Sequence, residues 1–218
     1  MKDVSGRIKQ NKTAPNGFAP TIERFEGTTH MNTTEAPLFT PLLMHDAPLA
    51  SRILLEQAHR YFGFVPNLIA TMAHSPSALR VYLNADLGFQ HGTLTPGEQQ
   101  IVLLAASKEN ACRYCTTSHS ALARFFVNVR GDAIVAIEND RPLSDPKLNA
   151  LVDLTRQLVS QRGYAPRATI DAFVAAGYSK DQLLEVLVGV GLKTISNYFD
   201  HVSEVEIDSE FLRTDRSG

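Results

Sequence analysis

The sequence predicts an all-α fold. From Pro48 to about residue 205, apolar residues recur three or four positions apart, as they do on the buried face of an amphipathic helix. Residues typical of helix starts and ends separate these segments, and we find neither a pair of strand-like segments nor an internal repeat. With 218 residues and 44% hydrophobic content, the chain is long enough to bury the core of one globular domain.

The first three predicted helices precede residue 90. Residues 49–63 carry an apolar stripe at helical spacing, and Gly63 is suited to end that helix. A short helix is predicted after Pro66, and a third helix runs from Pro76 to about Gly88.

A central helix is predicted to begin at Thr95-Pro96-Gly97-Glu98. Thr95 suits the N-cap, Pro96 the first helical position and Glu98 the third position of a capping box. Residues 101–106 are apolar on every side of the helix, so we expect neighbours all around it.

Four helices complete the predicted domain after residue 130. Residues 131–138 form a short helix, and Ser144-Asp145-Pro146 begins a long one. Residues 167–176 form another, and Ser179 caps a last long helix that runs to about residue 202.

The two ends of the chain differ from this helical domain, which we place at residues 48–205. Residues 1–47 lack sustained apolar periodicity, so they predict an N-terminal extension or arm, disordered in part, that packs on the domain or on a neighbouring subunit. For residues 1–30, an extension upstream of a start at Met31 is an equally good interpretation. Residues 206–218 are predicted to be a C-terminal tail.

Charge and hydropathy argue against several classes of function. The 21 basic and 23 acidic residues nearly balance, which argues against binding to nucleic acid or to a membrane surface. The sequence has no apolar run of about 18 residues, and its start lacks the apolar segment of a secretory signal. Two cysteines in a chain of this length are not a disulfide scaffold, and we predict a cytoplasmic protein.

The most specific chemical motif consists of Cys112, Cys115 and His119. They include both cysteines of the chain, and their spacing of three and four residues places all three side chains on one face of a helix. Two thiols at this spacing can form a reversible disulfide, and a pair of this kind in the cytosol indicates redox activity or metal binding.

The spacing also suggests a role for each side chain. If Asn110 ends the central helix and caps the next one, Cys112 lies in the first turn, where the helix dipole favours a thiolate. His119 lies four residues after Cys115, so it can accept the proton of an attacking Cys115 thiol. Cys112 would then resolve the sulfenic acid or mixed disulfide. Geometry alone leaves an exchange of roles between the cysteines open.

This motif resembles a known family. Cys112-Arg113-Tyr114-Cys115 followed by His119, after the apolar helix 98–107, is similar to the alkyl hydroperoxidase D (AhpD) and carboxymuconolactone decarboxylase superfamily, and more narrowly to its uncharacterised peroxidase-related members. The resemblance covers residues 48–205. It implies an AhpD-like antiparallel helical bundle that assembles into trimers or hexamers. It also implies thiol-dependent reduction of peroxides or of a partner's disulfide, with the cysteine nearer the histidine attacking the peroxide.

One position departs from the family. The family's proton relay uses a glutamate twelve residues before the first cysteine, and this chain has Gln100 there. The nearby carboxylates are Glu98 and Glu109, which we include as candidate catalytic residues, although Glu98 also fits a purely capping role. A disulfide reductase depends less on such a relay than a peroxidase does.

The sequence therefore predicts a thiol-dependent oxidoreductase that cycles Cys112 and Cys115 between dithiol and disulfide. Its substrate would be a small-molecule hydroperoxide or a partner disulfide. We find no flavin, haem or nucleotide motif and predict no cofactor, so electrons must come from an external thiol donor or a redox partner protein.

Four alternatives stay open. The first is lyase chemistry of the carboxymuconolactone decarboxylase type, and the second is a non-enzymatic redox-sensing module. In the third, the cysteines are buried, inert thiols. In the fourth, Cys112, Cys115 and His119 bind zinc, with His201 as a distant fourth ligand. His201 is also a candidate for the redox site, because the last helix could bring its polar face to the cysteines.

Overall fold

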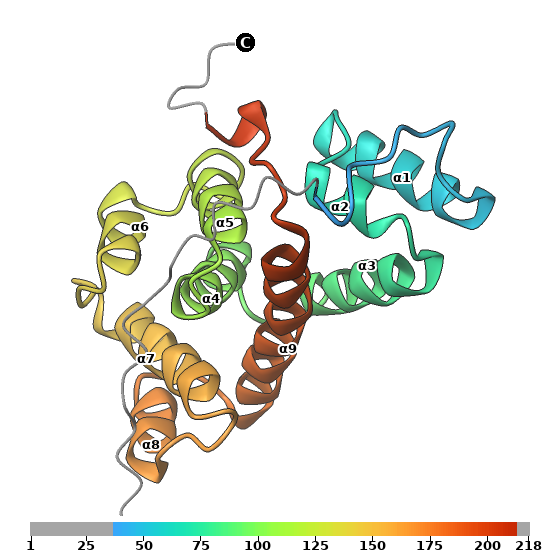
Figure 1. Cartoon of the computed structure of the whole chain (residues 1–218). Helices are drawn as coiled ribbons and strands as arrows, with labels where there is room; N and C mark the ends of the chain where they lie inside the picture. The colour runs from blue at the N-terminus through green and yellow to red at the C-terminus, as the bar shows by residue number, and fades with distance from the viewer. Residues whose placement is uncertain (1–36, 213–218) are drawn as a thin grey trace, which may run out of the picture. The chain divides into compact units, whose positions relative to one another are not determined.

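The prediction of an all-α fold is confirmed. A computed structural model describes residues 37–212, and within this range the chain forms helices and no strand (Figure 1). The helices are α1 (Leu49–Phe62), α2 (Asn67–Met72), α3 (Pro76–Gln90), α4 (Pro96–Glu109), α5 (Arg113–Phe125), α6 (Gly131–Glu138), α7 (Pro146–Ser160), α8 (Arg167–Ala175), α9 (Lys180–Ser203) and the 3-10 helix η1 (Ser209–Phe211).

Local signals in the sequence fix most of the helix ends. At the start of α4, the Thr95 hydroxyl accepts a hydrogen bond from the Glu98 N–H, and the Glu98 carboxylate accepts one from the Thr95 N–H. Ser179 and Gln182 form the same reciprocal pair at the start of α9. Gly63 ends α1 with a positive φ of 80°, a conformation that costs glycine little.

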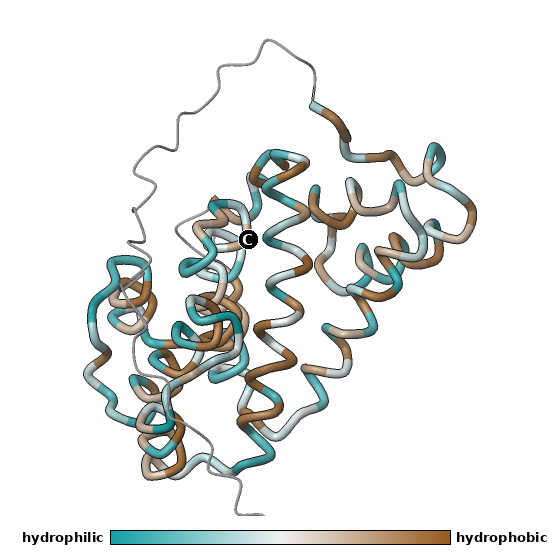
Figure 2. The backbone as a smooth tube through the Cα atoms, turned by 60° about the horizontal axis from the view of Figure 1, so that its bottom comes forward, coloured by the Kyte–Doolittle hydropathy of each residue, from teal (hydrophilic) through white to brown (hydrophobic). Residues whose placement is uncertain are grey.

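Helix α4 lies at the centre of the larger part of the bundle. It packs against α5, α6, α7 and α9, and every residue from Ile101 to Ser107 is buried. This explains why its sequence has no polar face. Figure 2 shows apolar and polar residues alternating along the other helices, as expected where only one side of a helix is covered.

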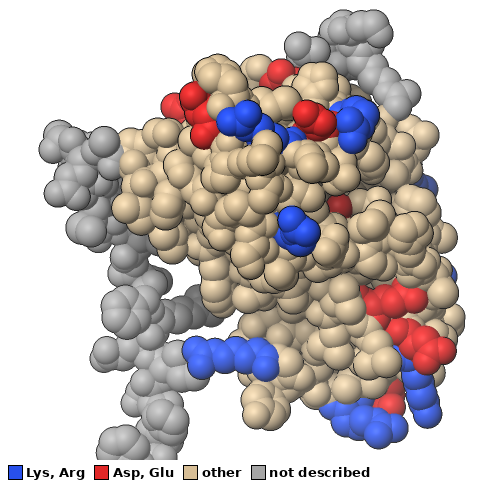
Figure 3. All heavy atoms as spheres, turned by 90° about the vertical axis from the view of Figure 1, so that its right-hand side faces the viewer, with Lys and Arg blue, Asp and Glu red and all other residues tan. Residues whose placement is uncertain are grey.

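Helix α9 joins this part of the bundle to helices α1–α3. It contacts α4, α5 and α7, and it also contacts α2 and α3 (Figure 1). A second apolar cluster is formed by α1, α2 and α3 with Ala47. Charged side chains are sparse and of both signs on the face that Figure 3 presents. No helix among residues 37–212 is long and apolar enough to cross a membrane.

The segments that flank the helices are packed where the structure describes them. Most of the predicted arm 1–47 lies outside the described residues, but the Leu42 N–H donates to the Ala70 carbonyl at 3.2 Å and Ala47 is buried. The predicted tail begins within the packed structure. Asp208 accepts a hydrogen bond from the Asn67 N–H at 2.9 Å, and Phe211 is buried against α5.

Two glycines of α9 provide a test of how tightly this helix packs. A Cβ at Gly189 would lie 2.8 Å from Val102 Cγ1 and 3.0 Å from the Phe89 ring, whereas a Cβ at Gly191 would meet nothing within 4 Å. We expect Gly189→Ala to lower the free energy of unfolding by about 1–3 kcal/mol through overpacking. The matched variant Gly191→Ala should raise it by about 0.5–1 kcal/mol because alanine favours the helix. Urea unfolding of both variants measures these changes. A higher free energy of unfolding in both variants would contradict the close packing at Gly189.

Candidate active site

The first cysteine begins helix α5. Cys112 is the N-cap, and its sulfur accepts a hydrogen bond from the Cys115 N–H at 3.3 Å. The expectation that Asn110 caps this helix is wrong, because Ala111 adopts a left-handed conformation with φ 57° and turns the chain once more before α5 begins. The prediction that Asn110 ends α4 is confirmed, and its side-chain amide donates to Asn197 Oδ1 at 2.9 Å.

Both thiols are buried and free of any disulfide. Each cysteine is 1% exposed. The Cys112 thiol lies 3.1 Å from Asp200 Oδ2, to which it donates a hydrogen bond, and the Cys115 sulfur lies 3.9 Å from the Ser196 hydroxyl. Helix α9 therefore supplies a different polar partner to each cysteine.

The third residue of the motif, His119, bonds to two side chains. Its Nδ1 lies 2.9 Å from Gln100 Oε1, and its Nε2 lies 2.9 Å from the amine of Lys193. An ammonium only donates hydrogen bonds, so Nε2 must be the accepting nitrogen and Nδ1 must carry the proton that Gln100 accepts. Burial, together with the charge of Lys193, holds the pKa of His119 well below its usual range, so the imidazole is neutral.

The two cysteines differ in acidity. The pKa of Cys115 is lowered to about 6, chiefly by a hydrogen bond from the Cys112 thiol and also by the Lys193 ammonium, which together outweigh burial. The pKa of Cys112 is raised, because its proton is shared with the Cys115 sulfur and Asp200 and because burial and the charges of both groups disfavour its anion. Cys115 is therefore the thiolate of the pair near neutral pH, and Cys112 is the thiol.

A polar stripe on α9 completes the site. It consists of Lys193, Ser196, Asn197 and Asp200, which are all buried and are spaced so that they share one face of the helix. The sequence predicts that this helix approaches the cysteines, with His201 as the candidate residue. His201 is exposed and stacks on Tyr198, with ring centroids 6.2 Å apart. The available signal was the spacing of these four polar residues, three or four positions apart, which places them on one face of the helix.

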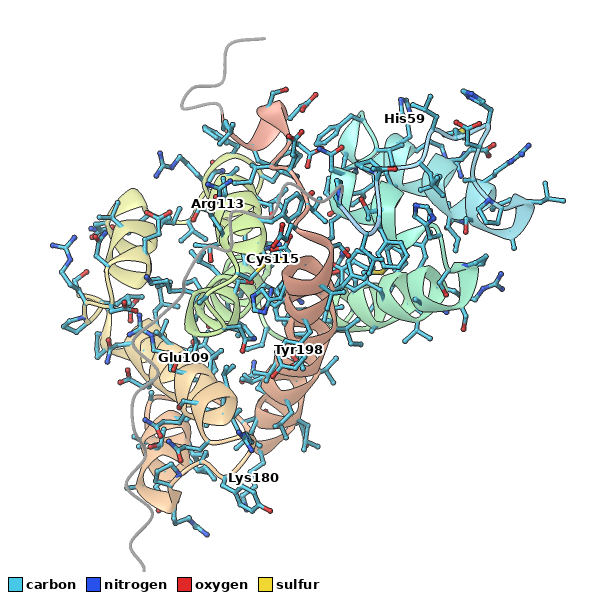
Figure 4. All side chains as sticks on the ribbon, in the orientation of Figure 1. His59, Glu109, Arg113, Cys115, Lys180 and Tyr198 are labelled. Carbon is cyan, nitrogen blue, oxygen red and sulfur yellow. The ribbon has the colours of Figure 1, made fainter. Side chains whose placement is uncertain are left out.

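The structure brings Cys112, Cys115 and His119 together but places the two candidate glutamates elsewhere. Glu98 is used by the capping box at the start of α4 and by an ion pair with Lys147 at 3.0 Å. Glu109 is exposed, and the charges that act on it are those of Arg156, Asp140 and Lys108. Figure 4 shows Cys115 between α5 and α9 and Glu109 beside α7.

A cavity of about 110 Å³ opens onto Cys115. Cys115 and His119 line it, whereas Cys112 does not. Its polar lining also includes Lys193, Gln100 and Asp86, and burial raises the pKa of the Asp86 carboxyl. The rest of the wall is largely apolar or aromatic and includes Phe62, Leu68, Tyr82, Leu103, Leu122 and Phe126. The reactive thiol thus faces a space suited to an apolar molecule.

We find no metal centre in the part of the chain that the structure describes. No group of three or more His, Cys, Asp or Glu side chains within residues 37–212 could hold a metal ion. The nitrogen of His119 that could bind a metal is occupied by the Lys193 ammonium, which would also repel a cation.

Comparisons with known proteins rest on structure alone, since no family model matches the sequence and no curated protein matches it significantly. An uncharacterised peroxidase-related protein from Ralstonia eutropha JMP134, titled alkylhydroperoxidase AhpD core, gives a TM-score of 0.71 at 21% identity, covering 81% of this chain and 96% of that chain. A peroxidase-related protein from Silicibacter sp. TM1040 gives 0.69 at 17% identity, covering 83% and 97%.

This chain has the AhpD-like fold. The debrominase Bmp8 shares it, with a TM-score of 0.69 at 17% identity over 80% of this chain and 94% of Bmp8. A cysteine-to-alanine variant of Bmp8 has been solved in complex with 2,3,4-tribromopyrrole.

In place of the glutamate that the resemblance predicts, His119 contacts two other side chains, those of Gln100 and Lys193. Gln100 does contact His119, but an amide cannot take up or release a proton at neutral pH. Lys193 contacts the other imidazole nitrogen through its amine, which is an ionisable group. Among the hydrogen bonds of the described residues, none joins His119 to Cys115 directly. The predicted role of His119 as the base for Cys115 stays a prediction, and the ionisable group beside both residues is Lys193.

We expect the alkylation of Cys115 to report its lowered pKa. The rate with iodoacetamide, followed by peptide mass spectrometry, should rise as pH increases through about 6 and then level off. An ordinary cysteine reaches this plateau only above about pH 8.5. Lys193→Met removes the nearby positive charge, so the midpoint of the pH profile of Cys115 alkylation should rise by about one pH unit or more in this variant.

Lys180→Met is the matched control, because Lys180 is exposed in the first turn of the same helix. Its profile should follow that of the wild type. If Lys193→Met and Lys180→Met had the same midpoint, Lys193 would have no part in activating the thiol.

Proposed function

We propose that the protein is a thiol-dependent oxidoreductase that reduces an organic hydroperoxide through a dithiol and disulfide cycle of Cys112 and Cys115. One observation carries the proposal: a cysteine with a lowered pKa opens onto an apolar cavity and has beside it a second thiol, whose sulfur accepts the Cys115 N–H at 3.3 Å. The AhpD-like fold shared with peroxidase-related proteins supports it. Electrons would come from an external dithiol or a redox partner protein.

The first step would oxidise Cys115. Its thiolate attacks the hydroperoxide and the O–O bond breaks, which leaves a sulfenic acid on Cys115 and an alkoxide that needs one proton. The Lys193 ammonium lines the same cavity and can supply that proton, so the product leaves as an alcohol. His119 accepts a hydrogen bond from Lys193 and so holds the amine in place.

The second step would form the disulfide. The Cys112 sulfur attacks the sulfenic acid sulfur, a disulfide forms, and the sulfenic oxygen leaves as water with the Cys112 proton. An external dithiol then reduces the disulfide by exchange and becomes a disulfide itself. The proton of the regenerated Cys115 thiol returns to neutral Lys193, which restores the thiolate and the ammonium for the next cycle.

Reductive dehalogenation of an aromatic ring is a second candidate. The aromatic and apolar cavity beside Cys115 favours it, and the debrominase Bmp8 has the same fold. The two thiols would supply two electrons, so an aryl bromide would yield the arene, bromide and a disulfide. Release of bromide from 2,3,4-tribromopyrrole in the presence of a dithiol distinguishes it from peroxide reduction.

Turnover of cumene hydroperoxide with dihydrolipoamide tests the main proposal. We expect the wild type to oxidise the dithiol catalytically, and Cys115→Ser to lose at least about 100-fold of the rate because its nucleophile is gone. Without the dithiol, Cys112→Ser should consume about one equivalent of peroxide per chain and stop, and with the dithiol it should turn over more slowly than the wild type, because the resolving thiol then has to come from solution. Equal turnover in the wild type and in Cys115→Ser would contradict the proposal.

In the same assay, Gln100→Glu shows whether the missing carboxylate limits the rate. A carboxylate at this position would accept the His119 Nδ1–H more strongly and add an acid–base group to the site. A rise in turnover means that Gln100 limits proton transfer, and an unchanged rate means that the missing carboxylate does not limit turnover. Gln57→Glu, on the exposed face of α1, is the matched control.

A further inference from the structure

The Cys112 thiol has two hydrogen-bond acceptors, and oxidation removes one of them. In the reduced site, its proton can be shared with the Cys115 thiolate and with Asp200 Oδ2, which lies 3.1 Å from the Cys112 sulfur. When Cys115 has become a sulfenic acid or a mixed disulfide, it no longer carries the negative charge that held this proton. Asp200 is then the remaining anionic acceptor at the thiol.

The surroundings of Cys112 exclude solvent as an alternative acceptor. Cys112 is 1% exposed and does not line the cavity that reaches Cys115. Its neighbours are largely apolar and include Leu68, Tyr114 and Phe211. A buried thiol in such surroundings is a poor nucleophile until it loses its proton, and burial opposes the formation of a free thiolate. The resolving step therefore needs a base that is already in contact with the sulfur.

Asp200 is held in a position to accept this proton. It lies in the last turns of α9, is 8% exposed, and its other carboxylate oxygen accepts a hydrogen bond from the Val205 N–H at 3.2 Å. This second bond fixes the carboxylate so that Oδ2 faces Cys112. No cation of the described residues forms an ion pair with Asp200, which leaves the carboxylate free to take up a proton.

We propose that Asp200 is the catalytic base for the resolving cysteine, which takes the proton of Cys112 as this sulfur attacks oxidised Cys115. The inference rests on the proposed dithiol cycle. As the Cys112–Cys115 disulfide forms, the bond between the Cys115 sulfur and its leaving group breaks, and the S–H proton moves to Asp200. With a sulfenic acid, the leaving hydroxide takes this proton from Asp200 and departs as water, which restores the carboxylate.

A neutral disulfide probe isolates this step from peroxide chemistry. When 2,2′-dithiodipyridine reacts with the dithiol, attack by Cys115 releases one pyridine-2-thione, and attack by Cys112 on the mixed disulfide releases the second. Absorbance in a stopped-flow instrument follows both phases at pH 7. Cys112→Ser should show the first phase only, which assigns the second phase to Cys112.

In Asp200→Asn we expect the second phase to slow by about 100-fold or more, as when a general base is removed. The first phase should stay at or above the wild-type rate, because the charge of Asp200 raises the pKa of Cys115 and its removal favours that thiolate. The asparagine oxygen can still accept the Val205 N–H, so the fold should be retained. Asp200→Ser is a second variant with the same expected result. Glu204→Gln, an exposed amide substitution four residues away, should leave both phases unchanged.

A second phase that is unchanged or faster in Asp200→Asn would overturn the inference, because it would show that the negative charge only opposes formation of the Cys112 thiolate. Cumene hydroperoxide with dimedone gives an independent readout, since the sulfenic acid of Cys115 should accumulate and be trapped in Asp200→Asn but not in the wild type. If the wild type reacts with the disulfide probe in two phases but not with the hydroperoxide, the peroxidase proposal fails and the role of Asp200 is still decided by the second phase.

Discussion

The hydrogen bond between Lys193 and His119 organises the polar centre of the protein. An ammonium group that is 1% exposed has lost its water, so it needs acceptors and opposite charge within the protein. His119 provides the acceptor at 2.9 Å, and the charges of Cys115 and Asp86 lie close enough to be coupled to that of Lys193. Three consequences follow: the imidazole stays neutral, α5 and α9 face each other with their polar sides, and Cys115 is favoured as a thiolate.

The two cysteines become unequal through their positions at the start of α5. Cys112 is the N-cap and points to Asp200, while Cys115 lies one turn further along and points to Lys193 and the cavity. A negative group thus faces the thiol and a positive group faces the thiolate. This arrangement supports the assignment of Cys115 as the attacking sulfur, an order that the spacing of the motif alone left open.

Features encoded within a few residues could be predicted from the sequence. The capping box of Thr95 and Glu98 and the left-handed Gly63 are local, so they were found correctly, and the spacing of the cysteine motif placed its side chains on one face. The N-cap of α5 was missed because Ala111 adopts a positive φ that its side chain does not signal. Lys193 and Asp200 were missed because the contacts of Lys193 with His119 and of Asp200 with Cys112 depend on how α9 packs against α5, over 74 and 88 residues of sequence.

Nitrogen-15 NMR of the His119 imidazole tests the central claim most directly. With the signals assigned by comparison with His119→Gln, we predict a ring that is neutral near neutral pH, that gains its second proton only at a pH well below the usual range of a histidine, and that carries its single proton on Nδ1, because burial and the charge of Lys193 oppose a second positive charge and Lys193 donates to Nε2. A ring that becomes doubly protonated with an ordinary pKa near about 6.5 would contradict the account. The positive charge of the site would then belong to His119, and Lys193 would not be the group that activates Cys115.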